Sequence, residues 1–229
     1  MKNSVLKNIR LFRRDMGNLL FHFTRSRPSG VLPPCQTATF PWVPPPPSAL
    51  EAKTAFEVLT EILTSGKIMG TSEFNKGGHR CVSFTEWPVS ELPSLFAING
   101  ELAKAGERPR YEPYGIAVKK EWLFQQQGRP VIYQPDAEYS YLPPELQWRH
   151  VRYEPPYIDF SWEREWRVQC NELQIQPNQV LVLVQYVNEA HSVTYGFSQL
   201  STGPHPKTGA NVTWSNPTWT AVSLDLFGM

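Results

Sequence analysis

The sequence has few cysteines, no long apolar run and no excess of either charge, and each absence excludes a class of protein. Its three cysteines, Cys35, Cys81 and Cys170, are an odd number without the spacing of a zinc site, so we expect reduced thiols and no metal centre. No apolar run approaches the roughly 18 residues that a membrane helix needs, and the first residues do not resemble a signal peptide. We therefore expect a cytoplasmic protein without a membrane segment.

The charge balance and the length of the chain limit its contacts with nucleic acid and the number of its domains. The 22 Lys and Arg nearly cancel the 21 Asp and Glu, so any contact with nucleic acid must be local. The 229 residues are 41% hydrophobic and 13% aromatic, which is enough for one well-filled domain. We expect a single domain over residues 18–229, preceded by a basic amphipathic helix over residues 1–17.

Two segments near the beginning of the sequence are expected at the surface. In residues 1–17, Val5, Ile9 and Phe12 recur at helical spacing among basic side chains. This pattern fits either a solvated helix or one that contacts nucleic acid or a partner. Residues 28–47 hold eight prolines, which exclude a core strand or helix and predict an extended loop.

The rest of the sequence predicts a helix and several strands. Ser48 and Glu51 have the spacing of a capping box, and the apolar pattern after them continues to Gly66, where the helix should end. A turn is expected at residues 75–80. Strands are expected at residues 114–118, 130–133, 179–187, 213–215 and 218–222. Trp214 and Trp219 are interpreted as packing residues.

The most informative segment is Ser-Trp-Glu-Arg-Glu-Trp-Arg-Val at residues 161–168. Read as a strand with a period of two, it divides into an apolar and a charged face: Trp162, Trp166 and Val168 against Glu163, Glu165 and Arg167. Two aromatic side chains packed into a core would hold the carboxylates opposite them in fixed positions, as a reactive site requires. The alternative is an exposed polar face on which Arg167 pairs with Glu165.

Two other predicted strands, at residues 18–24 and 81–86, also separate polar from bulky side chains. Their polar residues lie two apart and share a side: His22 with Thr24, and Ser83 with Thr85. Brought together with the charged face of residues 161–168, they would line a polar cleft with a hydrophobic backing, as small-molecule sites usually do. For His22 alone, a half-buried histidine bonded to a backbone carbonyl is the alternative.

The order His-x-Thr, Ser-x-Thr and Glu-x-Glu resembles the signature of the ADP-ribosyltransferase fold, whose members split NAD between ribose and nicotinamide. Over about residues 18–170, the sequence also resembles bacterial abortive-infection (AbiGi-like) phage-resistance proteins and, more distantly, DarT-type toxins that ADP-ribosylate nucleic acid. The resemblance implies an α+β fold: a split, mostly antiparallel β-sheet core with packed helices, and NAD as co-substrate.

The resemblance also implies roles for individual residues. Glu165 would be catalytic, and Glu163 would contact or activate the acceptor. The residues implied in NAD binding are His22, at a ribose hydroxyl, with Thr24, Ser83, Thr85, Tyr114 and Arg167. Whether Tyr111, Tyr114 or neither stacks on nicotinamide stays open. We favour Arg167 as the counter-ion of the carboxylates over a clamp on an NAD phosphate.

The cleavage of NAD itself requires a carboxylate such as the one assigned to Glu165. Breaking the bond to nicotinamide leaves an oxocarbenium-like ribose, which a fixed carboxylate such as Glu165 would stabilise. We expect a toxin or anti-phage effector that modifies nucleic acid, RNA or DNA, and has a neutralising antitoxin as its partner. The alternatives are a non-catalytic antitoxin or binding protein on the same fold, and an NAD glycohydrolase with water as acceptor.

Overall fold

The computed structural model describes residues 17–27, 52–73, 75–104, 111–197, 199–204, 208–209, 211–216 and 218–225. The predicted N-terminal helix, apart from Gly17, the proline-rich loop and the predicted capping box at Ser48 and Glu51 lie outside these residues.

The described residues form four α-helices and thirteen short strands. The helices are α2 (Ala55–Ser65), α3 (Leu92–Lys104), α4 (Lys120–Gln125) and α5 (Val187–Gly196). The strands are β1 (Leu19–Phe23), β2 (Lys67–Met69), β3 (Cys81–Thr85), β4 (Gly115–Lys119), β5 (Arg129–Pro130), β6 (Ile132–Gln134), β7 (His150–Arg152), β8 (Glu165–Gln169), β9 (Glu172–Gln174), β10 (Val180–Val184), β11 (Gln199–Pro204), β12 (Asn211–Asn216) and β13 (Ala221–Ser223). No helix among them is long and apolar enough to cross a membrane.

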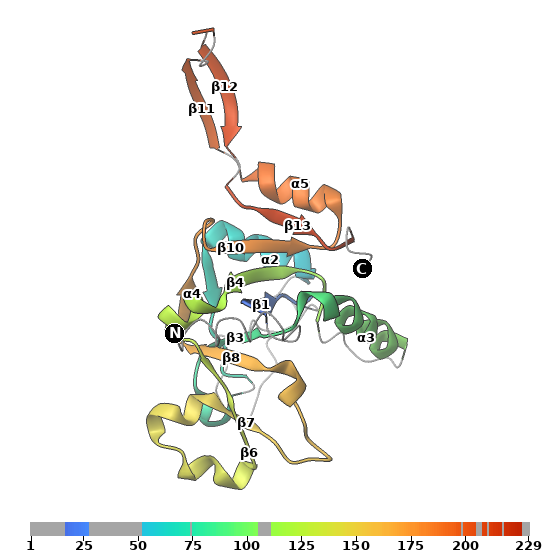
Figure 1. The fold of residues 1–229 in the computed structure, drawn as a ribbon, viewed down its shortest axis with the longest axis vertical. Coiled ribbons are helices and arrows are strands. Elements are labelled where there is room, and N and C mark those ends of the chain that lie inside the picture. Colours follow the sequence, from blue (N-terminus) through green and yellow to red (C-terminus); the bar gives the residue numbers. More distant parts are fainter. Residues whose placement is uncertain are drawn as a thin grey trace, which may run out of the picture.

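A seven-stranded sheet in the order β13-β10-β4-β1-β3-β8-β5 forms the body of the protein (Figure 1). All its pairs are antiparallel except β10 with β13. The expected α+β class with a mostly antiparallel sheet is therefore confirmed. The β1–β3 ladder holds one register pair, Phe21 with Thr85, whereas β1–β4 and β3–β8 each hold five. The sheet thus opens between β1 and β3.

Each face of the sheet has its own hydrophobic core. One face, which we call the α2 face, is covered by α2, α4 and α5 and carries Leu20, Phe84, Ile116, Val168 and Val182. The opposite α3 face carries Phe21, Ala117 and Leu183 and packs against Leu92 and Leu95 of α3. Because β10 contributes to both cores, its nearly continuous apolar sequence reflects burial on both sides, as predicted for residues 179–187.

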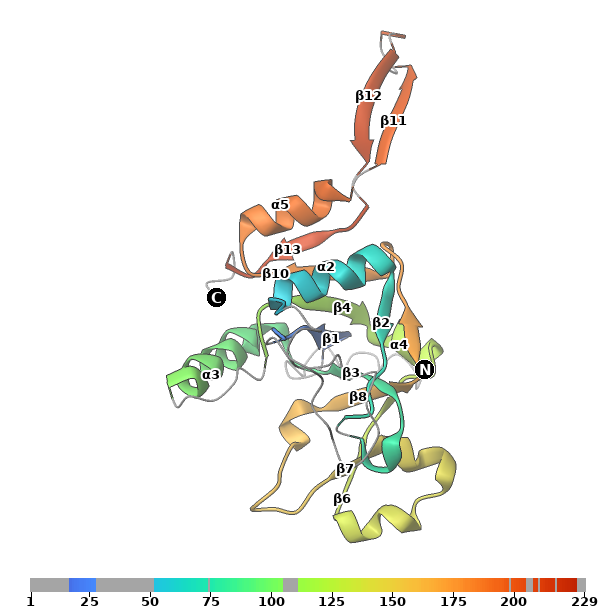
Figure 2. The ribbon, with the colours of Figure 1, turned by 180° about the vertical axis from the view of Figure 1, so that it is seen from behind.

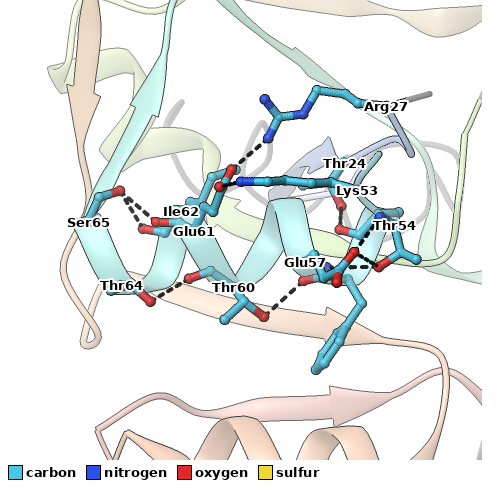
Figure 3. Close-up of polar contacts among 12 residues, drawn as sticks. Thr24, Arg27, Lys53, Thr54, Glu57, Thr60, Glu61, Ile62, Thr64 and Ser65 are labelled. Carbon is cyan, nitrogen blue, oxygen red and sulfur yellow. Dashed lines mark hydrogen bonds and ion pairs between the residues drawn. The ribbon is translucent and has the colours of Figure 1, made fainter. Parts of the chain in front are cut away.

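Helix α2 begins at Ala55, later than the predicted capping box at Ser48 implies. The Thr54 hydroxyl accepts a hydrogen bond from the backbone N–H of Glu57 at 3.2 Å, and the Glu57 carboxylate accepts one from the backbone N–H of Thr54 at 2.7 Å (Figure 3). This capping box lies next to the apolar pattern and fixes the start of the helix. Gly66, with φ of 65°, ends it as predicted.

Two parts of the chain extend from the sheet. The β11–β12 hairpin projects beyond α5 (Figures 1 and 2). At the other end, residues 129–160 form a lobe in which β6 pairs with β7. The predicted strand at residues 130–133 is divided here, because β5 pairs with β8 and β6 turns away to β7. Trp219 is buried in the core as predicted, whereas the Trp214 side chain lies outside the description.

The predicted strand at residues 161–168 is correct only from Glu165 onward. Ser161–Glu163 form a 3-10 turn, and Arg164 has a left-handed conformation with φ of 47°. The Asp159 carboxylate accepts hydrogen bonds from the backbone and hydroxyl of Ser161, a local arrangement that competes with strand pairing. Trp162 is consequently 41% exposed, so its predicted place on a packed strand face is wrong.

Trp166 keeps its predicted role. It packs against the α2-face core, its indole N–H donates to the Glu86 carboxylate at 3.2 Å, and Lys120, paired with Glu86 at 2.5 Å, lies 5.7 Å from its ring. Trp166 therefore links β8, the end of β3 and the start of α4.

We predict that Trp166→Ala lowers the free energy of unfolding by about 3 kcal/mol, the lower end of the range for a packed aromatic side chain. Trp162→Ala should cost at most about 1 kcal/mol, because the side chain is 41% exposed and its contacts include edge-to-face contacts with two aromatic rings and a hydrogen bond to the Asp159 carbonyl within the same turn. Urea unfolding of both variants measures the difference. Equal losses would contradict the description of residues 161–163 as a peripheral turn.

Candidate functional site

The structure divides the predicted site residues between the two faces of the sheet. Register pairs place Thr85 opposite Glu165 and Ser83 opposite Arg167, so all four side chains lie on the α3 face. His22 alternates with Phe21, and it is Phe21 that lies beside Thr85. His22 therefore lies on the α2 face with Leu20, and the single polar cleft expected from the sequence is not formed, because register decides which faces coincide.

His22 and Thr24 bond to backbone carbonyls instead. His22 Nδ1 donates to the Ser83 carbonyl oxygen at 2.8 Å, across the opening between β1 and β3, and its ring lies 5.6 Å from that of Phe84. Burial lowers the pKa of His22, so the imidazole is neutral near pH 7. The Thr24 hydroxyl donates to the Ala55 carbonyl at 2.8 Å (Figure 3). For His22 this is the alternative that the sequence left open.

Tyr114 and Tyr111 are also separated. The Tyr114 hydroxyl donates to the Glu189 carboxylate at 3.0 Å, which ties the start of β4 to α5. Burial and this carboxylate both raise the pKa of Tyr114. Tyr111 lies on the α3 face, with its ring 6.5 Å from Trp162, the neighbour of Glu163 in the chain. Of the two tyrosines, only Tyr111 therefore lies beside the turn that carries Glu163.

Glu165 and Arg167 form the central ion pair of the α3 face. Arg167 Nε and Nη2 donate to the two carboxylate oxygens of Glu165 at 2.8 and 3.1 Å. Arg167 Nη1 donates to the carbonyls of Trp148 and His150, both at 3.0 Å. Because Arg167 is only 4% exposed, these four contacts satisfy a buried guanidinium, and the predicted role of Arg167 as counter-ion matches the geometry.

Glu163 lies in the turn just before this pair. Its backbone carbonyl accepts a hydrogen bond from the Thr85 hydroxyl, and the Arg164 carbonyl accepts one from the backbone N–H of Glu86 at 3.3 Å. These bonds fix the turn against the end of β3. Thr85 thus supports the backbone of the turn, and the role in NAD binding that the resemblance implies for it stays a prediction.

Tyr133 is a residue of this site that the sequence did not indicate. Its hydroxyl accepts a hydrogen bond from the backbone N–H of Glu165 at 3.1 Å. Burial raises the pKa of Tyr133 to about 12, and the charges of Glu165 and Glu163 act in the same direction. The hydrogen bond holds the Tyr133 hydroxyl against the backbone of Glu165. Only the pairing of Val131 with Glu165 brings it there, and no motif in the sequence signals that contact.

Aromatic side chains gather next to the turn on the α3 face. We call this group the aromatic cluster; it consists of Phe23, Trp87, Phe96, Tyr111 and Trp162. Trp87 and Trp162 have ring centroids 6.0 Å apart in an edge-to-face arrangement. The Trp87 indole N–H is buried and finds no hydrogen-bond partner among the described residues. A buried donor without a partner is unusual and marks a position where a ligand acceptor would be favourable.

Comparisons of the chain with models of known protein families, with curated proteins and with solved structures found no match. The assignment of a function therefore depends on the geometry of the α3 face.

We predict that Arg167→Met lowers the free energy of unfolding by about 3 kcal/mol, because it leaves the mostly buried Glu165 carboxylate and two backbone carbonyls without their partner. Adding Glu165→Gln to Arg167→Met should recover part of this loss. Urea unfolding of the wild type, both single variants and the double variant forms a double-mutant cycle, and the coupling should be about 1 to 3 kcal/mol. Additive losses would contradict a close ion pair.

Proposed function

We propose that the α3 face around Glu165 is a site for ADP-ribosyl transfer from NAD. The observation that carries the proposal is the fixed orientation of the Glu165 carboxylate, whose partner Arg167 is itself held by two backbone carbonyls. The Glu165 side chain keeps 13% exposure, so the ion pair is not sealed from solvent. A preorganised carboxylate of this kind stabilises the positive charge that develops on ribose as nicotinamide departs.

Glu163 is the second carboxylate of the proposed mechanism. It precedes β8 in a turn that Thr85 and Glu86 hold in place, and the charges of Glu163 and Glu165 add to the effect of burial in raising the pKa of Tyr133. We assign to Glu163 the removal of a proton from the attacking group of the acceptor. Tyr133, with its raised pKa, keeps its proton at neutral pH and can donate a hydrogen bond to a reacting oxygen.

The aromatic cluster is the proposed binding surface for a ring of NAD. Trp162, a member of this cluster, lies in the same turn as Glu163. Trp162 is 41% exposed, so its ring can accept a stacked heterocycle. The unpartnered indole N–H of Trp87 would donate to an acceptor on that ring or on the adjoining ribose. In this arrangement His22 joins β1 to β3 on the α2 face through its hydrogen bond to the Ser83 carbonyl, and it does not contact a ribose hydroxyl.

The acceptor and the biological role follow from the resemblance of the sequence. We propose nucleic acid, RNA or DNA, as the acceptor, a role as a toxin or anti-phage effector in the cytoplasm, and a neutralising antitoxin as the partner. Transfer to water instead would make the protein an NAD glycohydrolase with the same residues in the same roles.

A non-catalytic binding protein is the second candidate, and a specific observation favours it. Both carboxylate oxygens of Glu165 are engaged by Arg167, and His22 and Thr24 lie on the other face of the sheet. These contacts are equally consistent with a purely structural role for the ion pair, which would then join β8 to the lobe at residues 129–160. On this reading the protein is an antitoxin or inhibitor that binds NAD weakly or not at all.

We predict that Glu165→Gln lowers transfer by about 10²- to 10³-fold, the usual loss for an electrostatic stabiliser. Glu163→Gln, the matched control two positions away, should reduce transfer to the acceptor more than nicotinamide release. The assay follows nicotinamide release from NAD and the appearance of ADP-ribose label on DNA, RNA or protein.

The Glu165→Gln variant leaves Arg167 without its charged partner, so its fold is checked by circular dichroism and urea unfolding. Glu165→Asp keeps the charge but withdraws the carboxylate, and it should also lose most activity. Full activity in both Glu165 variants would exclude the proposed role of this residue. Nicotinamide release without label on any macromolecule assigns water as the acceptor, and no NAD consumption by the wild type favours the binding protein.

A further inference from the structure

Two arginines lie close together beside the Glu165–Arg167 pair, at the outer edge of the sheet. Arg129 begins β5, the edge strand, and lies opposite Arg167 of β8. Arg149 ends the 3-10 turn at Pro144–Arg149, and its Nε donates to the carbonyl of Pro130 at 2.9 Å. Arg149 is therefore bonded to the residue that follows Arg129.

Both guanidinium groups are held in place without being neutralised. Arg129 Nη1 donates to the carbonyls of Phe124 at 3.0 Å and Gly128 at 2.7 Å, and its Cζ lies 3.9 Å from the centroid of the Phe124 ring. Within the described part of the chain, neither Arg129 nor Arg149 pairs with a carboxylate, whereas Arg152 in the same lobe pairs with Glu154 at 2.5 Å.

The two positive charges act on one another. The bond of Arg149 to Pro130 holds its guanidinium beside Arg129, and partial burial, and then the charge of Arg129, lower the pKa of Arg149. Arg129 still has the N–H groups of Nε and Nη2 to offer, and Arg149 has those of both terminal nitrogens. Two partly exposed and fixed guanidinium forks without an acidic partner form a binding site suited to phosphate, which accepts planar, paired hydrogen bonds.

The arginine pair and the aromatic cluster flank Glu165 on opposite sides. Trp162 of the aromatic cluster precedes Glu165 in the chain. Arg129 lies opposite Arg167, which follows Glu165 on β8. Two residues along a strand span about 7 Å, so the arginine pair and Glu165 are within reach of one bound strand. Arg167 also bonds the carbonyls on both sides of Arg149, so the pair is joined to the Glu165 ion pair through one guanidinium.

We infer that Arg129 and Arg149 bind backbone phosphates of the nucleic-acid acceptor and lead the strand toward Glu165. This inference rests on the proposed function for the identity of the acceptor. An NAD pyrophosphate is the other source of phosphate, but the donor surface that we assign lies at the aromatic cluster, on the far side of Glu165. In the seven-stranded sheet β5 is the edge strand, and no further strand of the described residues pairs with its outer side, which leaves room for a polymer that continues past the arginines.

The test measures binding of fluorescent single-stranded RNA and DNA oligonucleotides of equal length by anisotropy at several salt concentrations. We expect the double variant Arg129→Gln/Arg149→Gln to bind more weakly and to reduce the slope of log K against log salt by about 1 to 1.5, as expected for two lost phosphate contacts. Arg129→Lys/Arg149→Lys should keep most of that slope, because the charges remain. Arg152→Gln is the matched control and should keep the wild-type slope.

Arg129→Gln removes bonds to two carbonyls, so Arg149→Gln alone is measured as well and should lower the slope by about 0.7. A wild-type slope in Arg149→Gln, or the same decrease in Arg152→Gln, overturns the inference. A raised KM for NAD with unchanged oligonucleotide binding assigns the arginines to the NAD pyrophosphate and also overturns it. If the wild type binds oligonucleotides through these arginines yet never consumes NAD, the phosphate site stands and the proposed transfer reaction fails.

Discussion

The buried guanidinium of Arg167 connects the parts of the structure on which the proposed site depends. It bonds the Glu165 carboxylate within β8 and the carbonyls of Trp148 and His150 in the lobe at residues 129–160. An arginine in this environment is stable only if most of its donors are satisfied, so the lobe and the carboxylate must both be in place. The same four contacts set the direction of the Glu165 carboxylate and the position of the chain around Arg149.

The Glu165–Arg167 ion pair is compatible with both a structural and a catalytic role. A carboxylate that is fixed and ionised is what an oxocarbenium-like transition state needs, and it is also what a structural ion pair provides. The difference lies in the surroundings. The turn that carries Glu163 contacts the aromatic cluster through Trp162, the Tyr133 hydroxyl bonds the backbone of Glu165, and the Trp87 indole N–H is buried without a partner in the described residues.

The sequence predicted the alternation within each strand well. His22 and Thr24 do oppose Phe21 and Phe23, and Trp166 and Val168 do oppose Glu165 and Arg167, because side chains of a strand alternate whatever surrounds it. The prediction failed where local hydrogen bonds competed with the strand. Asp159 bonds Ser161 and forms a turn, which removes Trp162 from the packed face. At α2, the Thr54 and Glu57 pattern, nearer to the apolar residues, forms the capping box.

The sequence by itself therefore determined the buried strand at residues 180–184 and the end of α2 at Gly66, since each depends on residues close together in the chain. The α+β class was expected from the resemblance, and the pairing of Arg167 with Glu165 was one of the arrangements that the sequence left open. Only the tertiary structure decided which polar faces coincide. The Phe21–Thr85 register turns His22 away from Glu165, and the β5–β8 pairing brings Tyr133, Arg129 and Arg149 to the carboxylates. The physical reason is that a shift of one residue in register exchanges the two faces of a strand, and that shift is selected by packing between distant segments.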